Sequence, residues 1–304
     1  MDSPTEAPAK PVVLVTGARG FTGRHLKREL LAHGYSVVGT IIEGAPDVDE
    51  VVMDLGDPAS VRAVVQRTQP DYVVHLAAIS HVQHQPELDF YRVNVLGTLH
   101  LVDALAELPR PPRKTLIASS ANVYGNSTRS PLDEDALPAP VNHYAVSKLA
   151  MEHLVRTRFE RLPIIVTRPF NYTGVGQGEQ FVVPKIVAHF RRRASVVELG
   201  NLDVARDFSD VRSVVGAYRR LLESTAVSEV LNLASGIGTS LRDVIDHLTV
   251  LAAHEIEVRV NPAFVRASEV RTLVGDASRL QARIGAVQAI PLVETLRWML
   301  SQPD

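Results

Sequence analysis

The sequence predicts an α/β protein built on a doubly wound parallel sheet, with a smaller α/β domain toward the C-terminus. Three observations support this fold. Short apolar runs alternate with helical segments over the first half of the 304 residues, a glycine-rich turn follows the first apolar run, and the alternation loosens after Arg168. A chain of this length can bury one large core or two smaller ones.

The first strand and its turn carry the strongest signal. Residues 12–15 form an apolar run typical of a buried parallel strand. Gly17, Gly20 and Gly23 follow at three-residue intervals and open a helix that extends to about His33. Glycine lets the backbone approach a pyrophosphate, and a helix N-terminus offers N–H donors to it. This turn therefore predicts a dinucleotide site, with a first gap one residue longer than in G-x-G-x-x-G.

The alternation of strands and helices continues along the chain. It places ligands at the carboxyl ends of the strands, where Asp54, Ala77 and Ala78 are expected to lie. The predicted strands are residues 35–42, 51–53, 72–76, 114–119 and 163–167, and the predicted helices are residues 58–69, 87–108 and 144–160.

The part after Arg168 is expected to form the smaller domain, closing over the strand ends. A glycine-punctuated loop at 170–178 precedes predicted helices at about 183–193, 211–223 and 241–252. Asp210 and Ser240 are the expected N-caps of the last two helices. We assign residues 11–170, rejoined by 207–234, to the cofactor domain. Residues 171–206 with 235–304 form the second domain.

Composition excludes several classes of function. The net charge of −2 argues against nucleic acid as a partner, and the absence of cysteine excludes disulfides and thiolate chemistry. The first ten residues resemble a disordered leader, and no apolar stretch is long enough for a bilayer, so we expect a cytoplasmic protein. His75, His81 and His84 lack accompanying carboxylate or cysteine ligands, so we expect no metal site.

Tyr144 and Lys148 form a candidate acid and base pair. On a helix they would lie at i and i+4 on one face. An unperturbed tyrosine has a pKa of about 10 and is a poor catalyst near neutral pH. A neighbouring ammonium would favour the phenolate and lower that pKa. A solvated lysine four residues after a packed tyrosine would give the same sequence pattern. The functional interpretation of the pair therefore depends on the motifs around it.

Those surroundings resemble the extended short-chain dehydrogenase/reductase family. The resemblance rests on the glycine turn, Asn94, Ser120 and the Tyr144-x-x-x-Lys148 pair in this order. It implies that Tyr144 is the acid or base, that Ser120 bonds the reacting oxygen, that Lys148 holds the nicotinamide ribose, and that Asn94 supports the lysine. The residues expected to bind the cofactor are Gly17, Arg19, Gly20, Phe21, Thr22, Gly23, Asp54, Leu55, Ala77, Ala78, Tyr144 and Lys148.

Extended members of the family act mostly on nucleotide sugars, and dehydratases among them need an additional carboxylate after the serine. Ala121 and Asn122 stand at the corresponding positions here, so we do not expect dehydration. Ketone reduction and 4-epimerisation with retained NAD both remain open. A non-enzymatic dinucleotide sensor is the third possibility, although sensors of this fold usually lack the tyrosine and lysine pair.

The second half resembles the GDP-mannose 4,6-dehydratase branch, and within it the GDP-6-deoxy-4-keto-mannose reductases that make GDP-rhamnose. The motifs are 200–208, 235–239, Arg266-x-x-Glu269 and 275–276. The resemblance implies a GDP-sugar substrate. Its expected contacts are Ser80 and His81 with the sugar, Asn171, Lys185, Arg206 and Arg266 with the pyrophosphate, and Glu269 with ribose hydroxyls. Guanidinium groups bind phosphate well, and carboxylates accept from diols.

Two further predictions concern the cofactor preference and the oligomeric state. The second strand ends in Ile41 and Ile42 and lacks the acid that would bind the ribose diol of NAD. Arg19 could reach a 2′-phosphate, so we favour NADP(H), with NAD(H) possible. By resemblance, the helices at 87–108 and 144–160 would form a four-helix interface between two copies, which predicts a homodimer.

Overall fold

The core of the protein is a seven-stranded parallel sheet. The structure is a computed structural model that describes residues 10–82, 84–127, 129–264 and 271–302. The strands lie in the order β10-β6-β5-β4-β1-β2-β3, and every pairing is parallel. This confirms the doubly wound fold. The strands are β1 Val12–Thr16, β2 Ser36–Ile41, β3 Glu50–Val52, β4 Tyr72–His75, β5 Lys114–Ala118, β6 Ile164–Pro169 and β10 Glu229–Leu233.

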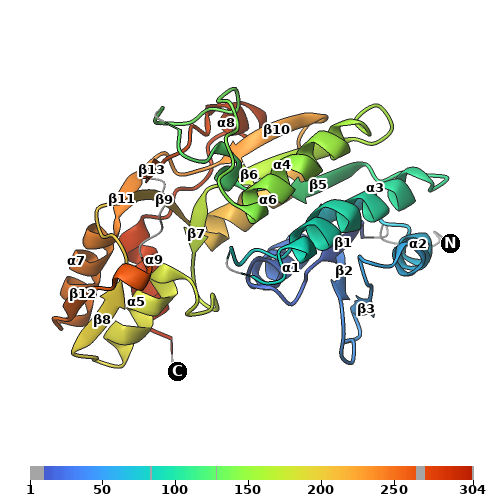
Figure 1. Cartoon of the computed structure of the whole chain (residues 1–304). Helices are drawn as coiled ribbons and strands as arrows, with labels where there is room; N and C mark the ends of the chain where they lie inside the picture. The colour runs from blue at the N-terminus through green and yellow to red at the C-terminus, as the bar shows by residue number, and fades with distance from the viewer. Residues whose placement is uncertain (1–9, 83, 128, 265–270, 303–304) are drawn as a thin grey trace.

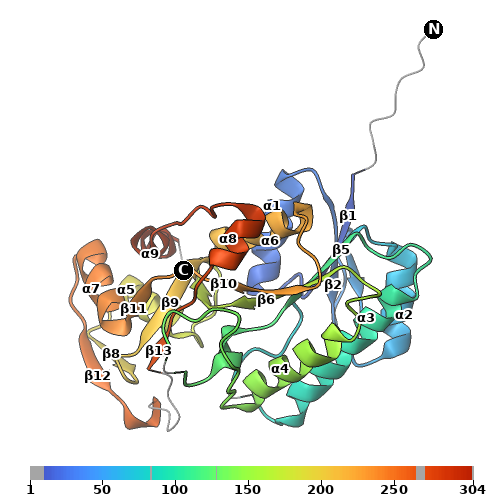
Figure 2. The same cartoon turned by 90° about the horizontal axis from the view of Figure 1, so that it is seen from above.

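Helices cover both faces of this sheet (Figures 1 and 2). One face carries α1 Phe21–Ala32, α6 Val211–Glu223 and the short α8 Ser278–Ile284, whose apolar residues share one core with the sheet. The other face carries α2 Pro58–Thr68, α3 Thr98–Ala106 and α4 His143–Arg156, which pack into a second core. Because both faces are covered, the strands are apolar on both sides, as the sequence indicates.

Smaller sheets lie beside the C-terminal ends of these strands, to the left of the large sheet in Figure 1. β9 Ala205–Asp210 pairs with β7 Asn171–Thr173, β11 Gly238–Ser240 and β13 Thr272–Leu273, while β8 Val196–Leu199 pairs with β12 Glu257–Val260. A third core joins them to α5 Val182–Arg191, α7 Leu241–Ala252 and α9 Leu292–Leu300. A short η3 Pro262–Phe264 follows β12. The division of the chain into two domains stays a prediction.

Helix starts follow the local chemistry predicted from the sequence. Asp210 accepts a hydrogen bond from the Arg212 amide at 2.7 Å at the start of α6. Ser240 and Asp243 form a reciprocal capping box at the start of α7. Both N-cap predictions are therefore confirmed. None of the described helices is long and apolar enough to cross a membrane.

One predicted helix has a different geometry. The segment 87–108, expected to be a continuous α-helix, consists of the π-helix η1 Phe90–Gly97 followed by α3. A π-helix has wider turns and often marks a functional site. Apolar periodicity indicates a helix over this segment but does not distinguish the π form from the α form.

A buried hydrogen-bond chain joins β1, β4 and η1. The Thr16 hydroxyl lies 2.7 Å from His75 Nδ1, and His75 Nε2 lies 2.9 Å from the Thr98 hydroxyl, which donates to the Asn94 carbonyl. Since that hydroxyl donates onward, His75 must donate to it from Nε2 and accept at Nδ1. Burial lowers the pKa of His75 to about 3, so the ring is neutral. His75 is thus a structural link between strand ends.

Candidate active site

A cavity of about 540 Å³ opens at the carboxyl ends of the central strands. Its walls come from the glycine turn, the ends of β4, β5 and β6, the start of α4 and the loop after β7. This is the edge where doubly wound sheets bind ligands. The predicted site residues that line it are Gly17, Arg19, Gly20, Phe21, Thr22, Gly23, Ala77, Ala78, Ser80, His81, Ser120, Tyr144, Lys148 and Asn171.

The glycine turn fits an anionic cofactor. Gly17 has a φ of +72°, and a Cβ there would lie 3.0 Å from the backbone of Ala77. A Cβ on Gly23 would lie 2.3 Å from the Gly17 carbonyl oxygen, so α1 packs against the turn more closely than a side chain permits. No side chain caps the N-terminus of α1, which starts after Gly20. Its first-turn amides can therefore serve a pyrophosphate.

Tyr144 occupies the first turn of α4. The helix begins at the N-cap Asn142, whose side chain accepts from the Ala145 amide at 2.9 Å. Burial raises the pKa of Tyr144 to about 12, and its hydrogen bond to Ser120 opposes this rise. The phenol is therefore protonated at neutral pH and is suited to donate a proton to a reacting oxygen.

Lys148 does not lower the pKa of this phenol, contrary to the prediction from sequence. Its ammonium is buried and donates to the Ala118 carbonyl at the end of β5, at 2.8 Å. Burial lowers the pKa of Lys148 to about 8 against the opposing charge of Glu152. Burial is the largest cause of both pKa shifts, so each group is shifted toward its neutral form.

Asn94 lies behind the cavity wall. Its amide oxygen accepts from the Ile79 amide at 2.9 Å, and its nitrogen donates to the Ile79 carbonyl and to the Ser147 hydroxyl, both at 3.1 Å. Ser147 precedes the lysine on α4. Asn94 therefore joins the segment after β4 to the helix that carries Tyr144 and Lys148.

Two predicted cofactor contacts lie away from the cavity lining. The carboxylate of Asp54 accepts from the Gly56 amide at 2.8 Å. Leu55 packs in the core, and its carbonyl accepts from His100 Nδ1 at 2.8 Å. Their contact with adenine stays a prediction.

Besides Asn171, four predicted substrate contacts belong to the second half of the chain. Lys185 donates to the Glu198 carbonyl at 2.7 Å and lies 4.4 Å from the ring centre of Phe264. Arg206 donates to the carbonyls of Ala205 and Arg271. Neither side chain is part of the cavity lining. The two remaining predicted contacts, Arg266 and Glu269, lie outside the described residues.

The strand β7 and the loop after it supply contacts that the sequence did not reveal. Tyr172 lies with its hydroxyl 2.8 Å from that of Thr22, and its ring stacks on Phe21 with centroids 6.0 Å apart. Gln177 and Gln180 line the same wall. An aromatic residue within a glycine-punctuated loop was the available signal, but its partners are 150 residues away in the sequence.

Comparison with known proteins agrees with this architecture. The model of the family described as GDP-mannose 4,6 dehydratase matches residues 14–299. The chain belongs to this family. It is an NAD(P)-dependent oxidoreductase of the extended short-chain dehydrogenase/reductase type.

Relatives and solved structures resemble it over nearly their whole length. GDP-6-deoxy-D-talose 4-dehydrogenase of Aggregatibacter actinomycetemcomitans is 37% identical, covering 90% of this chain and 91% of the relative. GDP-6-deoxy-D-mannose reductase of Pseudomonas aeruginosa is 34% identical, covering 95% and 96%. A structure from Burkholderia cenocepacia with a provisional epimerase designation superposes with a TM-score of 0.91 and 46% sequence identity. RMD from Pseudomonas aeruginosa complexed with NADPH superposes with a TM-score of 0.85 and 33% sequence identity. Each match covers 96% of this chain and 97% of the other chain.

The family name describes a dehydratase, yet the described residues of the cavity wall do not supply the acid that dehydration requires. Ala121 is buried in the short helix η2 Ala121–Tyr124, and Asn122 lines the cavity. Among the described residues, none of those that line the cavity is an aspartate or glutamate. Removing a proton from a sugar carbon and expelling a hydroxyl requires such a group, so this geometry favours hydride exchange alone.

A glycine variant tests whether the turn is the cofactor cradle. We predict that Gly23→Ala weakens NAD(P)H binding at least tenfold and destabilises the protein, because its Cβ would meet the Gly17 carbonyl. The matched control is Gly216→Ala in α6, where a Cβ meets no atom within 4 Å. That change should raise stability by about 0.5–1 kcal/mol and leave cofactor affinity unchanged. Fluorescence titration and thermal unfolding would measure both. Unaltered affinity in Gly23→Ala would contradict the assignment.

Proposed function

We propose that the protein reduces the C4 ketone of a GDP-4-keto-6-deoxyhexose with NAD(P)H, converting GDP-6-deoxy-4-keto-D-mannose to GDP-D-rhamnose or its C4 epimer. The observation that carries this proposal is a cavity that combines Ser120, Tyr144 and Lys148 with no lining carboxylate among the described residues. Two relatives named for GDP-6-deoxyhexoses support the substrate class.

The reaction assigns a role to each catalytic residue. When bound, the reduced nicotinamide supplies the hydride that C4 of the sugar receives. The Tyr144 phenol, protonated because of its burial, donates its proton to the carbonyl oxygen, so that the ketone becomes an alcohol. Ser120 donates a hydrogen bond to the same oxygen and stabilises the charge that develops there. Lys148 would bind the nicotinamide ribose, and Asn94 fixes the helix on which both act.

Substrate recognition is proposed from three residues that line the cavity and four that the family resemblance implies. Ser80, His81 and Asn171 line the cavity and would contact the sugar and pyrophosphate. Lys185 and Arg206, together with the predicted contacts Arg266 and Glu269, would bind the pyrophosphate and ribose of GDP, as the family resemblance implies.

Removal of one hydroxyl tests the proton donor. We expect Tyr144→Phe to lower kcat for keto-sugar reduction about 10²–10⁴-fold, because general acid catalysis contributes that much. Affinity for NAD(P)H should change less than about twofold. The matched control is Tyr91→Phe, whose hydroxyl contacts His143 and does not line the cavity. Full turnover by the Tyr144 variant would refute its role.

The second candidate function is a nucleotide-sugar 4-epimerase with tightly bound NAD. The Burkholderia neighbour with the provisional epimerase designation favours it. Hydride removal and return at C4 would use the same Ser120, Tyr144 and Lys148. An epimerase would retain its cofactor through purification and show no net oxidation during turnover.

For the cofactor, we propose NADP(H), with NAD(H) as the alternative. Arg19 in the glycine turn lines the cavity, and its Nη1 has no partner among the described residues. Its other donors are engaged: Nε and Nη2 contact the Glu50 carboxylate at 2.6–3.2 Å, and Nη2 also donates to the Ala45 carbonyl. A 2′-phosphate could therefore use one edge of the guanidinium. RMD complexed with NADPH supports this choice.

Replacement of Arg19 tests this preference. Arg19→Ala should raise the dissociation constant of NADPH about tenfold and that of NADH less than about twofold, because only NADPH carries the 2′-phosphate. Arg62→Ala on α2, far from the cavity lining, is the control. Equal weakening of both cofactors would remove the argument.

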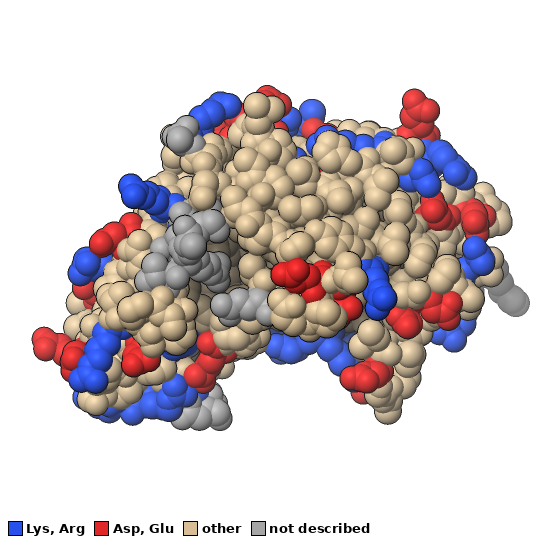
Figure 3. Space-filling model, viewed as in Figure 1, with Lys and Arg blue, Asp and Glu red and all other residues tan. Residues whose placement is uncertain are grey.

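A homodimer is proposed from the surface of α4 and of the continuous helical segment formed by η1 and α3. Leu96 of η1 and Val146 and Leu154 of α4 are large apolar residues exposed by 50%, 37% and 38%. Figure 3 shows few charged side chains over these helices, while charges lie around the rim. We expect light scattering to give twice the chain mass of 33.2 kDa, and Leu154→Arg to give the monomer mass. A wild-type monomer would contradict this proposal.

A further inference from the structure

The largest fully buried side chain is a charged one that the proposed reaction does not use. Arg168 on β6 is 2% exposed, and Glu152 on α4 is 0% exposed. Their contact is bidentate, with Nε 3.0 Å from Oε1 and Nη2 2.7 Å from Oε2. Well-packed apolar residues often stabilise a core as well as a buried ion pair does. The hydrogen bonds that this pair makes to other groups are therefore of interest.

One of these bonds holds the residue before Ser120. The Ser119 hydroxyl donates to Glu152 Oε1 at 2.6 Å. The Ser119 amide also donates to the Thr167 carbonyl at 2.7 Å, beside Arg168 on β6. Ser119, which directly follows β5, is thereby bonded to Glu152 and to the backbone of β6 next to Arg168.

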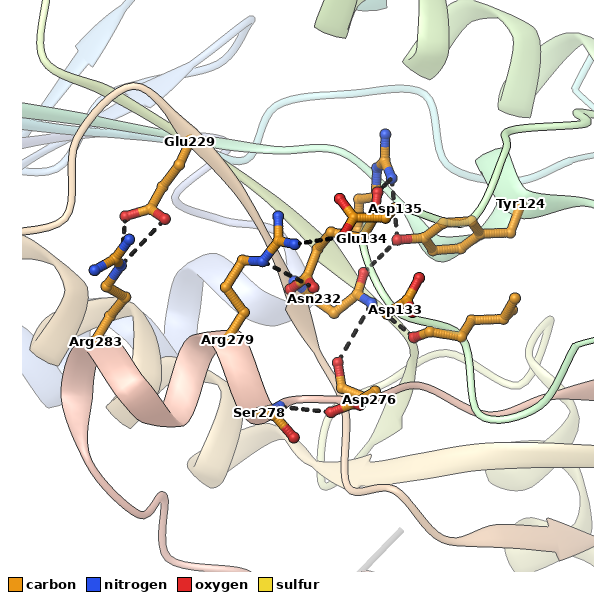
Figure 4. Close-up of polar contacts among 12 residues, drawn as sticks. Tyr124, Asp133, Glu134, Asp135, Glu229, Asn232, Asp276, Ser278, Arg279 and Arg283 are labelled. Atoms are coloured by element: carbon orange, nitrogen blue, oxygen red, sulfur yellow. Dashed lines mark hydrogen bonds and ion pairs between the residues drawn. The ribbon is translucent and has the colours of Figure 1, made fainter.

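The second bond holds the segment after Ser120. Arg168 Nη1 donates to the Tyr124 hydroxyl at 3.0 Å, and that hydroxyl donates to Asn232 Oδ1 at 2.7 Å. Figure 4 shows Tyr124 pointing toward Asn232, which lies beside Glu134. The Glu134 carboxylate accepts from the Asn232 amide at 2.7 Å. Tyr124 closes η2, so the pair fixes the far end of this turn.

Ser120 lies between these two attachments. It is the N-cap of η2, and its Oγ accepts from the Asn122 amide at 3.2 Å. With that lone pair engaged, the Ser120 hydroxyl can donate into the cavity, whose wall it shares with Tyr144.

We infer that the ion pair of Glu152 and Arg168 has a positioning role. Through Ser119 and Tyr124 it holds the Ser120 hydroxyl at a fixed position relative to Tyr144. This inference rests on the proposed function, in which Ser120 bonds the reacting oxygen. The ion pair joins α4, which carries Tyr144, to β6, and its hydrogen bonds to Ser119 and Tyr124 hold the residues on either side of Ser120. The positions of Ser120 and Tyr144 therefore both depend on this one buried ion pair.

The test removes both attachments and leaves the ion pair in place. The double variant Ser119→Ala with Tyr124→Phe should lower kcat about 10–100-fold, because a displacement of about 1 Å can cost that much. KM for the keto sugar and the dissociation constant of NAD(P)H should change less than about twofold. The control is Thr115→Val on the same strand, whose buried hydroxyl has no hydrogen-bond partner among the described residues. It should keep wild-type kcat.

A variant cycle separates positioning from a merely structural role. In a Ser120→Ala background the double variant should cause no further loss of kcat, because its effect passes through Ser120. An equal loss in both backgrounds, or an unchanged kcat when Ser120 is present, would overturn the inference.

The same set of variants distinguishes the inference from the proposed function. Full activity of Ser120→Ala would remove the proposed role of Ser120 and the inference with it. Lost activity in Ser120→Ala with a fully active double variant would remove the inference alone. If the wild-type protein does not turn over the keto sugar, a crystal structure of the double variant decides. Ser120 in the same position relative to Tyr144 as in the wild-type structure would overturn the inference, and its displacement would support it.

Discussion

The site depends on the parallel register of β1, β4, β5 and β6. Parallel neighbours end at the same edge of the sheet, so the residues that follow them converge. Gly17 follows β1, Ala77 follows β4, Ser120 follows β5 and Asn171 follows β6, and all four line one cavity. The hydrogen bonds through His75 fix two of these ends at the level of side chains. A slip in register would separate the glycine turn from Ser120.

Burial controls the chemistry at this edge. It raises the pKa of Tyr144 to about 12 and lowers those of Lys148 and His75 to about 8 and 3. All three shifts favour the neutral form, as desolvation requires. The Tyr144 phenol is consequently protonated at neutral pH, and His75 is a neutral hydrogen-bonding link. Charge persists in the core at Glu152 and Arg168 because each neutralises the other and their remaining polar atoms have partners.

Much of the fold and several site positions could be predicted from sequence because their signals are local. Apolar runs gave the central strands, and glycine spacing gave the turn and the start of α1. Other features depend on long-range contacts. Asn94 bonds the Ile79 backbone 15 residues earlier, and Arg19 is engaged by Glu50, which is 31 residues away. The pKa of Tyr144 was predicted with the wrong sign, because spacing gives the distance to Lys148 and burial sets the outcome.

The central claim is net reduction of a keto sugar at this cavity. The most direct measurement follows cofactor absorbance and sugar product together, with GDP-6-deoxy-4-keto-D-mannose generated in situ by a dehydratase. The account predicts one NAD(P)H oxidised for each ketone consumed, with a GDP-6-deoxyhexose as product. Interconversion of GDP- or UDP-hexoses by protein that retains its NAD, with no net oxidation of cofactor, would contradict it.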